Sequence, residues 1–178
     1  MTEVLVDTGP LVAVLARRDQ HQARCVEVLK GLSPPLLTCW PVITETAYLL
    51  RDHAEAIQAL LRMLEHGFLE LLPLDVSDVP WLRAFFEKYR DQEPQLADAA
   101  LLRLAERDGL DTIFTIDHRH FKMYRIAGNK ALHLLPKSFD DGLPCGAFAD
   151  GRPLLASRRK LGIAVSFVEI RHFPEGHL

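Results

Sequence analysis

Four acidic residues lie where the local sequence predicts the end of a strand or the start of a helix: Asp7, Glu45, Asp98 and Asp117. Each is next to strongly apolar sequence, where an unpaired negative charge is costly. If the fold brings these residues together, a divalent metal ion is the simplest way to hold so much negative charge in one place. A metal ion in an acidic pocket indicates hydrolysis of a phosphodiester bond.

Carboxylate oxygens are the ligands that Mg²⁺ or Mn²⁺ prefers. An ion held in this way lowers the pKa of a bound water and neutralises charge on the phosphate that is cleaved. Thr8 and Thr115 each lie close to one of the acids, and either hydroxyl could hold a water or a phosphate oxygen. Arg119 is a candidate for a phosphate contact, because guanidinium groups bind phosphate well.

Each acid also has a structural interpretation. Asp7 could cap the helix that follows it, and Asp98 could complement the dipole of the helix in which it lies. Glu45 could be an exposed helical residue. For a single acid, structural and functional roles are equally favoured, but four acids at four matching positions favour a shared site.

Short apolar runs alternate with helical patterns along the chain. Strands are expected at residues 3–6, 36–39, 68–72, 112–116 and 132–135, and helices at 11–16, 21–32, from Pro41 onward, 54–65, 77–89 and 94–109. This alternation predicts an α/β fold, a three-layer sandwich with a mostly parallel central sheet of four to five strands. Ligands of such sheets bind at the carboxyl ends of the strands, where the four acids are expected.

The length and composition of the chain fit one globular domain. The chain has 178 residues, of which 48% are hydrophobic and 25% charged. No apolar run is long enough to cross a bilayer and the N-terminus lacks a basic signal region, so we expect a cytoplasmic location and no membrane partner. The net charge of −3 argues against nonspecific adhesion to nucleic acid, although bound metal and local Arg clusters can reverse the sign around a cleft.

The sequence pattern changes near residue 138, where Gly and Pro interrupt the periodic segments. We therefore expect a nuclease domain at residues 1–137 and a C-terminal extension at 138–178, with a late strand at 163–170. The three cysteines, Cys25, Cys39 and Cys145, form no Cys-x-x-Cys pair. Reduced, buried thiols are expected for them.

The order and spacing of several stretches resemble the PIN domain family, and most closely the VapC-type toxins of bacterial and archaeal toxin–antitoxin pairs. The matching stretches are residues 4–13, 19–23, 42–45 and 96–101, followed by 113–117. Together they cover roughly residues 3–136 of the chain.

The resemblance implies a metal-dependent endoribonuclease whose catalytic acids are Asp7, Glu45, Asp98 and Asp117. It further implies that Asp7 and Asp98 are the central ligands of Mg²⁺ or Mn²⁺, that Asp117 is a further ligand or supports one, and that Glu45 orients water or a second ion. The implied partners are an RNA substrate and an antitoxin protein that threads a peptide into the active groove. A homodimer is also expected.

The chain departs from the family pattern at residues 118–121, where another acid is common and this sequence has His118, Arg119, His120 and Phe121. This departure bears on whether a second metal ion binds. His118 and His120 would point the same way on leaving a strand. Structural or RNA-contacting roles are favoured for them over metal binding, since no third His or Cys is nearby.

Two other functions compete with this interpretation. A strand ending in Asp7 also resembles haloacid-dehalogenase-type phosphatases, but these need a second Asp two positions later, where this chain has Gly9. The other alternative is a catalytically silent PIN-like module that binds RNA or protein. Trp40 and Trp81 could stack on bases in either RNA-binding case, although packing in the core is favoured for both.

Overall fold

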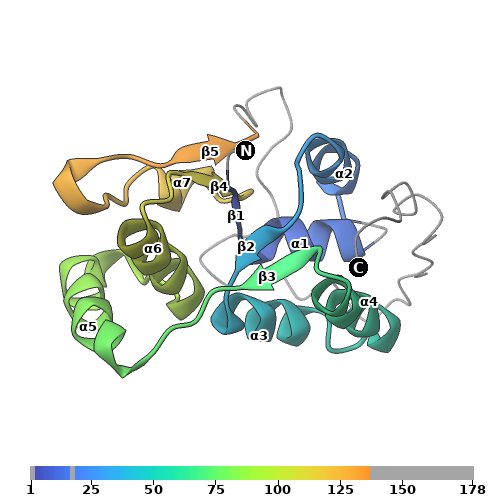
Figure 1. The fold of residues 1–178 in the computed structure, drawn as a ribbon, viewed down its shortest axis with the longest axis horizontal. Coiled ribbons are helices and arrows are strands. Elements are labelled where there is room, and N and C mark those ends of the chain that lie inside the picture. Colours follow the sequence, from blue (N-terminus) through green and yellow to red (C-terminus); the bar gives the residue numbers. More distant parts are fainter. Residues whose placement is uncertain (1–2, 17–18, 137–178) are drawn as a thin grey trace.

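The computed structural model describes residues 3–16 and 19–136 (Figure 1). In chain order the elements are β1 (Leu5–Val6), α1 (Thr8–Leu15), α2 (Gln22–Lys30), β2 (Leu36–Thr38), α3 (Trp40–Leu49), α4 (Ala54–Glu65), β3 (Leu69–Leu71), the 3₁₀ turn η1 (Val76–Asp78), α5 (Val79–Lys88), η2 (Arg90–Gln92), α6 (Leu96–Asp108), β4 (Thr112–Phe114), α7 (His118–Phe121), η3 (Ala127–Asn129) and β5 (His133–Leu135).

The sheet of the described residues has five strands, all parallel, in the order β3-β2-β1-β4-β5. Leu5 of β1 pairs with Leu37 of β2 on one side and with Ile113 of β4 on the other, so β1 is central. Helices flank the sheet (Figure 1), as expected for a three-layer α/β fold. Because the strands are parallel, the segments that follow β1, β2 and β4 leave the sheet at the same edge. We call this the carboxyl edge.

The helices that carry the remaining acids are held by apolar packing. In α6, Ala and Leu side chains are buried on successive turns, and the helix ends at Gly109, whose φ of 72° suits a residue without a side chain. Helix α3 buries Val42, Ile43 and Thr46, and it packs against α1 and α6. These contacts fix the starts of α3 and α6 relative to the central strand.

Most of the expected elements are present, with ends displaced by a few residues. Helix α1 begins at Thr8 rather than Leu11, because the Asp7 side chain caps it. The expectation that His118 and His120 leave a strand on the same side was wrong, since both lie in α7. This short helix forms because Asp117 caps it and Phe121 is buried.

Several expectations fall on residues that the structure does not describe. They are the strand at 163–170, the extension at 138–178 and the state of Cys145, and the domain division near residue 137 stays a prediction. Cys25 and Cys39 are buried and free, as expected. Of the helices within the described ranges, none has the length and apolar character needed to cross a membrane.

Candidate functional site

Asp7 lies at the carboxyl edge, directly after β1, and its side chain is held at both oxygens. Oδ1 accepts a hydrogen bond of 2.7 Å from the backbone N–H of Thr8, as a helix cap does. Oδ2 accepts a hydrogen bond of 2.7 Å from the hydroxyl of Thr115, which follows β4. Asp7 is only 6% exposed. Hydrogen bonds from two neighbouring segments therefore fix one buried carboxylate at the centre of the edge.

Thr8 and Thr115 connect Asp7 to two other acids. The Thr8 hydroxyl donates a hydrogen bond of 2.7 Å to Oε2 of Glu45 in α3. The Thr115 hydroxyl oxygen accepts a hydrogen bond of 2.9 Å from the backbone N–H of Asp117. Both threonines, considered from the sequence as contacts for water or phosphate, thus hold acidic residues in place.

Asp117 is the N-cap of α7 and contacts a histidine of the same helix. Its Oδ1 accepts a hydrogen bond of 3.1 Å from the backbone N–H of His120. Its Oδ2 lies 2.6 Å from Nδ1 of His120. Arg119, the candidate phosphate contact, is exposed on this helix. His120 is a residue that sequence reasoning did not connect with Asp117, and the spacing of three residues after a cap was the available signal.

Asp98 is the third residue of α6, and its carboxylate accepts a hydrogen bond from the backbone N–H of Gln95. This is half of a capping box, so the structural role considered from the sequence is present. The same carboxylate interacts electrostatically with Asp7, Asp117 and Glu45. Asp98 therefore both caps α6 and lies among the acids at the carboxyl edge.

Burial and the neighbouring acids raise the pKa of two of these carboxyl groups, Asp7 and Asp98. Burial raises the pKa of Asp7 to about 7 against the opposing hydrogen bonds from Thr115 and Thr8, and the charges of Glu45 and Asp117 raise it further. Burial also raises the pKa of Asp98 well above its ordinary value, and the charges of Asp7, Asp117 and Glu45 add to this. The structure thus brings the four predicted acids together, and we name them the acidic cluster.

Within the described part of the chain, most of this negative charge has no ion-pair partner. Among residues 3–16 and 19–136, Asp117 is paired with His120, but Asp7, Glu45 and Asp98 form no ion pair. The part of the chain described here also holds no group of three His, Cys, Asp or Glu side chains already arranged to bind a metal ion. The donor chemistry and charge of the cluster fit a divalent cation, whereas its arrangement needs some side-chain rotation to close around one.

Gly9 accounts for the close approach of α1 to the segment after β4. A Cβ atom at this position would collide with the side chain of Ile116. The absence of a side chain at Gly9 lets the start of α1 lie against the segment that carries Thr115 and Asp117. Position 9 therefore has no room for the second acid of a haloacid-dehalogenase-type phosphatase.

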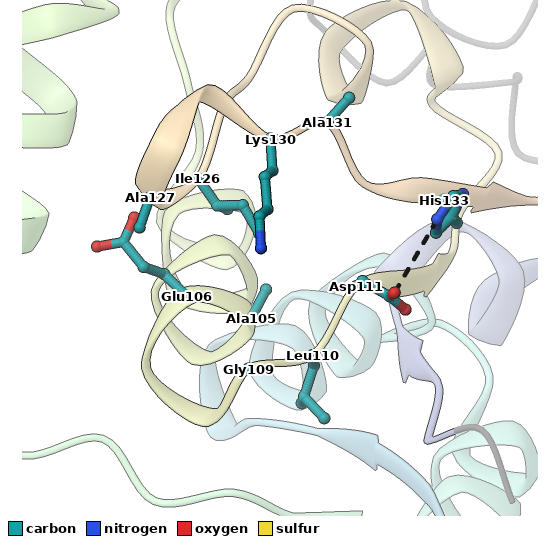
Figure 2. A pocket seen from close by; sticks show the side chains of 10 residues that line it. All are labelled: Ala105, Glu106, Gly109, Leu110, Asp111, Ile126, Ala127, Lys130, Ala131 and His133. Atoms are coloured by element: carbon teal, nitrogen blue, oxygen red, sulfur yellow. Dashed lines mark ion pairs between the residues drawn. The ribbon is translucent and has the colours of Figure 1, made fainter.

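A cavity in the described part of the chain lies away from the acids. It has a volume of about 420 Å³ and is lined by residues that include Gly109, Asp111, Lys130 and His133 (Figure 2). Gly109 and Asp111 precede β4, and His133 opens β5, so the cavity lies at the amino ends of these strands. The acidic cluster is at the opposite edge, and the cavity is not part of it.

The two tryptophans have different surroundings. Trp81 stacks on Phe85 with ring centroids 5.4 Å apart and donates a hydrogen bond of 2.8 Å to Glu106, as expected for a packed residue. Trp40 is 59% exposed at the start of α3, so its expected place in the core was wrong. The first residue of a helix has neighbours on fewer sides than a residue of its middle, which explains the difference.

The parallel sheet with acids at its carboxyl edge can be compared with protein families and proteins that are already known. Residues 4–128 match the PIN domain family, and the chain belongs to this family. Within it, Ribonuclease VapC26 of Mycobacterium tuberculosis is 30% identical over 135 residues, which span 75% of this chain and 100% of that protein. The expected resemblance to VapC-type proteins is thereby confirmed.

A solved structure agrees on the fold. VapC20 of Mycobacterium tuberculosis, described as a toxin that cleaves the sarcin–ricin loop, aligns with a TM-score of 0.58. The alignment covers 62% of this chain and 87% of that chain at 16% identity. At this identity the likeness concerns the α/β fold alone, and the expected sheet of parallel strands flanked by helices is common to both.

Proposed function

We propose that this chain is a Mg²⁺- or Mn²⁺-dependent endoribonuclease in which Asp7, Glu45, Asp98 and Asp117 are the catalytic acids. The observation that carries the proposal is the meeting of these four carboxylates at one edge of the sheet, where the Thr8 hydroxyl bonds to Glu45 and where Asp98 interacts electrostatically with the other three acids. Buried or half-buried acids that have no ion-pair partner among the described residues, such as Asp7 and Asp98, are poor stabilisers of a fold and good ligands for a divalent cation. The relative named as a ribonuclease supports RNA as the substrate.

In this mechanism Asp7, Asp98 and Asp117 would hold the ion, which would supply neutralisation of charge on the phosphate and a lowered pKa of the attacking water. The Thr8 amide and the Thr115 hydroxyl keep the two oxygens of Asp7 in a fixed orientation. The Thr8 hydroxyl holds Oε2 of Glu45. Glu45 then presents its other oxygen to orient the attacking water.

Two residues support these roles from α7. His120 holds Oδ2 of Asp117 through Nδ1, at 2.6 Å, and so limits the rotation of that carboxylate. Arg119 is exposed and contacts a phosphate of the bound strand. Positive charge at this point offsets the repulsion between RNA and the acidic cluster.

The test is cleavage of mixed RNA by the purified full chain with Mg²⁺, with Mn²⁺ and with EDTA. The wild type should cleave only with metal, and Asp7→Asn and Asp98→Asn should each lower the rate by roughly 100-fold or more. Asp52→Asn is the matched control, because Asp52 is exposed beyond the far end of α3. Cleavage that survives EDTA, or that both cluster variants retain, would contradict the proposal.

The same experiment decides on the silent-module alternative, in which the acids are kept without catalysis. That alternative draws on the incomplete ion-binding arrangement of the described side chains. Tight binding of RNA by the wild type, with no cleavage under any metal condition, would establish it in place of the nuclease.

We further propose that the chain acts as the toxin of a toxin–antitoxin pair in the cytoplasm and that it forms a homodimer. Its partners are then RNA, an antitoxin protein and a second copy of itself. The VapC-type relatives support this assignment. Light scattering of the purified chain tests the dimer directly.

A further inference from the structure

Trp40 is a large apolar side chain that the fold leaves in solvent next to the acidic cluster. It is the first residue of α3, directly after β2 and Cys39, so it lies at the carboxyl edge. The position is close to Asp7: burial raises the pKa of Cys39 to about 12, and the charge of Asp7 contributes to the shift. Glu45 follows in the same helix, about 7.5 Å further along its axis.

A second exposed apolar residue occupies the equivalent position in the other acid-bearing helix. Leu96 is the first residue of α6, two positions before Asp98, and it is 54% exposed. Helices α3 and α6 pack against each other. The openings of the two helices thus place Trp40 and Leu96 at the edge that carries the acids.

The exposure of Trp40 gives the fold no packing benefit. A buried indole contributes a large apolar area to a core, and this contribution is mostly lost when the ring stays in solvent. Trp81 shows the contrast, because its ring stacks on Phe85 and its Nε1–H bonds to Glu106. Trp81 therefore serves the fold, and Trp40 is available for a ligand of the neighbouring site.

We propose that Trp40 positions the substrate by stacking on an RNA base next to the scissile phosphate, with Leu96 providing an apolar wall beside it. This inference rests on the proposed nuclease function. Proteins that read RNA commonly hold unstacked bases against aromatic side chains, and carboxylates that bind a cation offer no such surface for a base. Stacking beside the cluster supplies attraction that the negatively charged acids do not.

Steady-state cleavage of a fluorophore-labelled oligoribonucleotide tests the proposal. Trp40→Ala should raise KM roughly 5- to 150-fold, with kcat within about twofold of the wild type, because the ring contributes binding and no chemistry. Trp40→Phe retains an aromatic face and should restore most of the affinity. Leu96→Ala should raise KM in the same direction by a smaller factor. An unchanged KM in a folded Trp40→Ala protein would overturn the proposal.

Tryptophan fluorescence gives a second readout that does not need turnover. The chain has two tryptophans, so Trp81→Phe leaves Trp40 as the sole emitter and Trp40→Phe leaves Trp81. The same oligoribonucleotide without its fluorophore should quench the emission of Trp40 and leave that of Trp81 unchanged. Equal responses of the two emitters would count against stacking at Trp40.

The outcomes separate this inference from the proposed function. Metal-dependent cleavage with an unaltered KM in Trp40→Ala refutes stacking and leaves the nuclease intact. A Trp40→Ala protein whose oligomeric state changes while its KM does not would assign the ring to a protein interface, which also refutes stacking. If the wild type cleaves no RNA, the nuclease fails, and quenching of Trp40 alone still decides whether the ring contacts RNA.

Discussion

At the scale of single residues, structural roles and the proposed catalytic roles fall on the same side chains. Asp7 caps α1 through Oδ1 and accepts the Thr115 hydroxyl through Oδ2. Asp98 accepts the Gln95 amide while it interacts with the other acids. The hydrogen bonds orient the carboxylates, and the burial that makes them effective also makes their negative charge costly.

Because burying the charge of Asp7 is costly, we expect the stability of the metal-free protein to depend on pH. The pKa of Asp7 is raised from 3.8 to about 7, so the folded state binds a proton more tightly than the unfolded state does. Stability should therefore fall as pH rises between about 4 and 7, where the unfolded chain has already lost this proton. Melting temperatures measured in EDTA across this range check the expectation.

Asp7→Asn is the variant that isolates the effect, because the amide has no charge to bury and is still a good cap. Its melting temperature should vary less over the same range than that of the wild type. Adding Mg²⁺ at pH 8 should stabilise the wild type more than the variant. If the melting temperatures of the two proteins changed with pH in the same way, the charge of Asp7 would not be the cause of the pH dependence.

At the scale of elements, an ion-pair network anchors the helix that carries Asp98. Asp78, at the end of η1, is fully buried and receives Arg103 at 2.7 Å and Arg107 at 3.2 Å, both from α6. The hydrogen bond from Arg103 is the main reason that the pKa of Asp78 is lowered. The network therefore ties the start of α5 to α6 away from the acidic cluster.

Removing this charge should destabilise the fold. Asp78→Asn leaves two guanidinium groups short of their partner, and we expect a loss of about 2–4 kcal/mol in the free energy of unfolding. Because the folded pKa is lowered, the contribution is complete above the unfolded value of 3.8 and is lost as pH falls through the folded value. Urea unfolding at pH 7 and at pH 3 measures both effects.

Glu87→Gln is the control for this prediction. Glu87 pairs with Arg90 at 3.6 Å, and both side chains are highly exposed. Its loss should change stability by less than about 0.5 kcal/mol. Similar destabilisation by the two variants would mean that burial of Asp78 adds nothing to its ion pairs.

At the scale of the whole molecule, the proposed function predicts a cellular phenotype. Expression of the full chain should slow the growth of a bacterial host, because an unopposed endoribonuclease degrades RNA that the cell needs. The Asp98→Asn chain, expressed to the same level, should not. Growth curves and the mapping of new RNA ends check the prediction. Normal growth with abundant folded wild-type chain would contradict toxin activity.

The sequence was sufficient for much of the fold. The buried strands are short runs of apolar and β-branched residues, such as residues 4–6 and 112–114, and these runs can be recognised from the local sequence. Three of the acids could be found because Asp7 and Asp117 follow strands and Asp98 lies in the first turn of a helix, whereas Glu45, expected near a helix start, lies in the middle of α3. Helix α7 could not be predicted, since its four residues show no helical spacing of apolar side chains. The helix depends on the Asp117 cap and on burial of Phe121.

The hydrogen bonds of the site were beyond sequence reasoning. The Thr8–Glu45 bond joins residues 37 positions apart, and the Thr115–Asp7 bond joins residues 108 positions apart. Local patterns do not contain such pairings, because packing of the whole sheet creates them. The exposure of Trp40 could not be predicted from the sequence either. The local sequence around a tryptophan at a helix start is the same whether or not another part of the fold covers the ring.

The contact between Gly9 and Ile116 limits the evolutionary routes open to this chain. Changing its chemistry to that of an aspartyl-phosphate enzyme would require an acid at position 9, and that substitution alone pushes Ile116 aside and with it the strand exit that supports Thr115. A smaller residue at position 116 would relieve this collision, so the order of the two substitutions matters. An acid at position 9 should be tolerated better once Ile116 has been shortened.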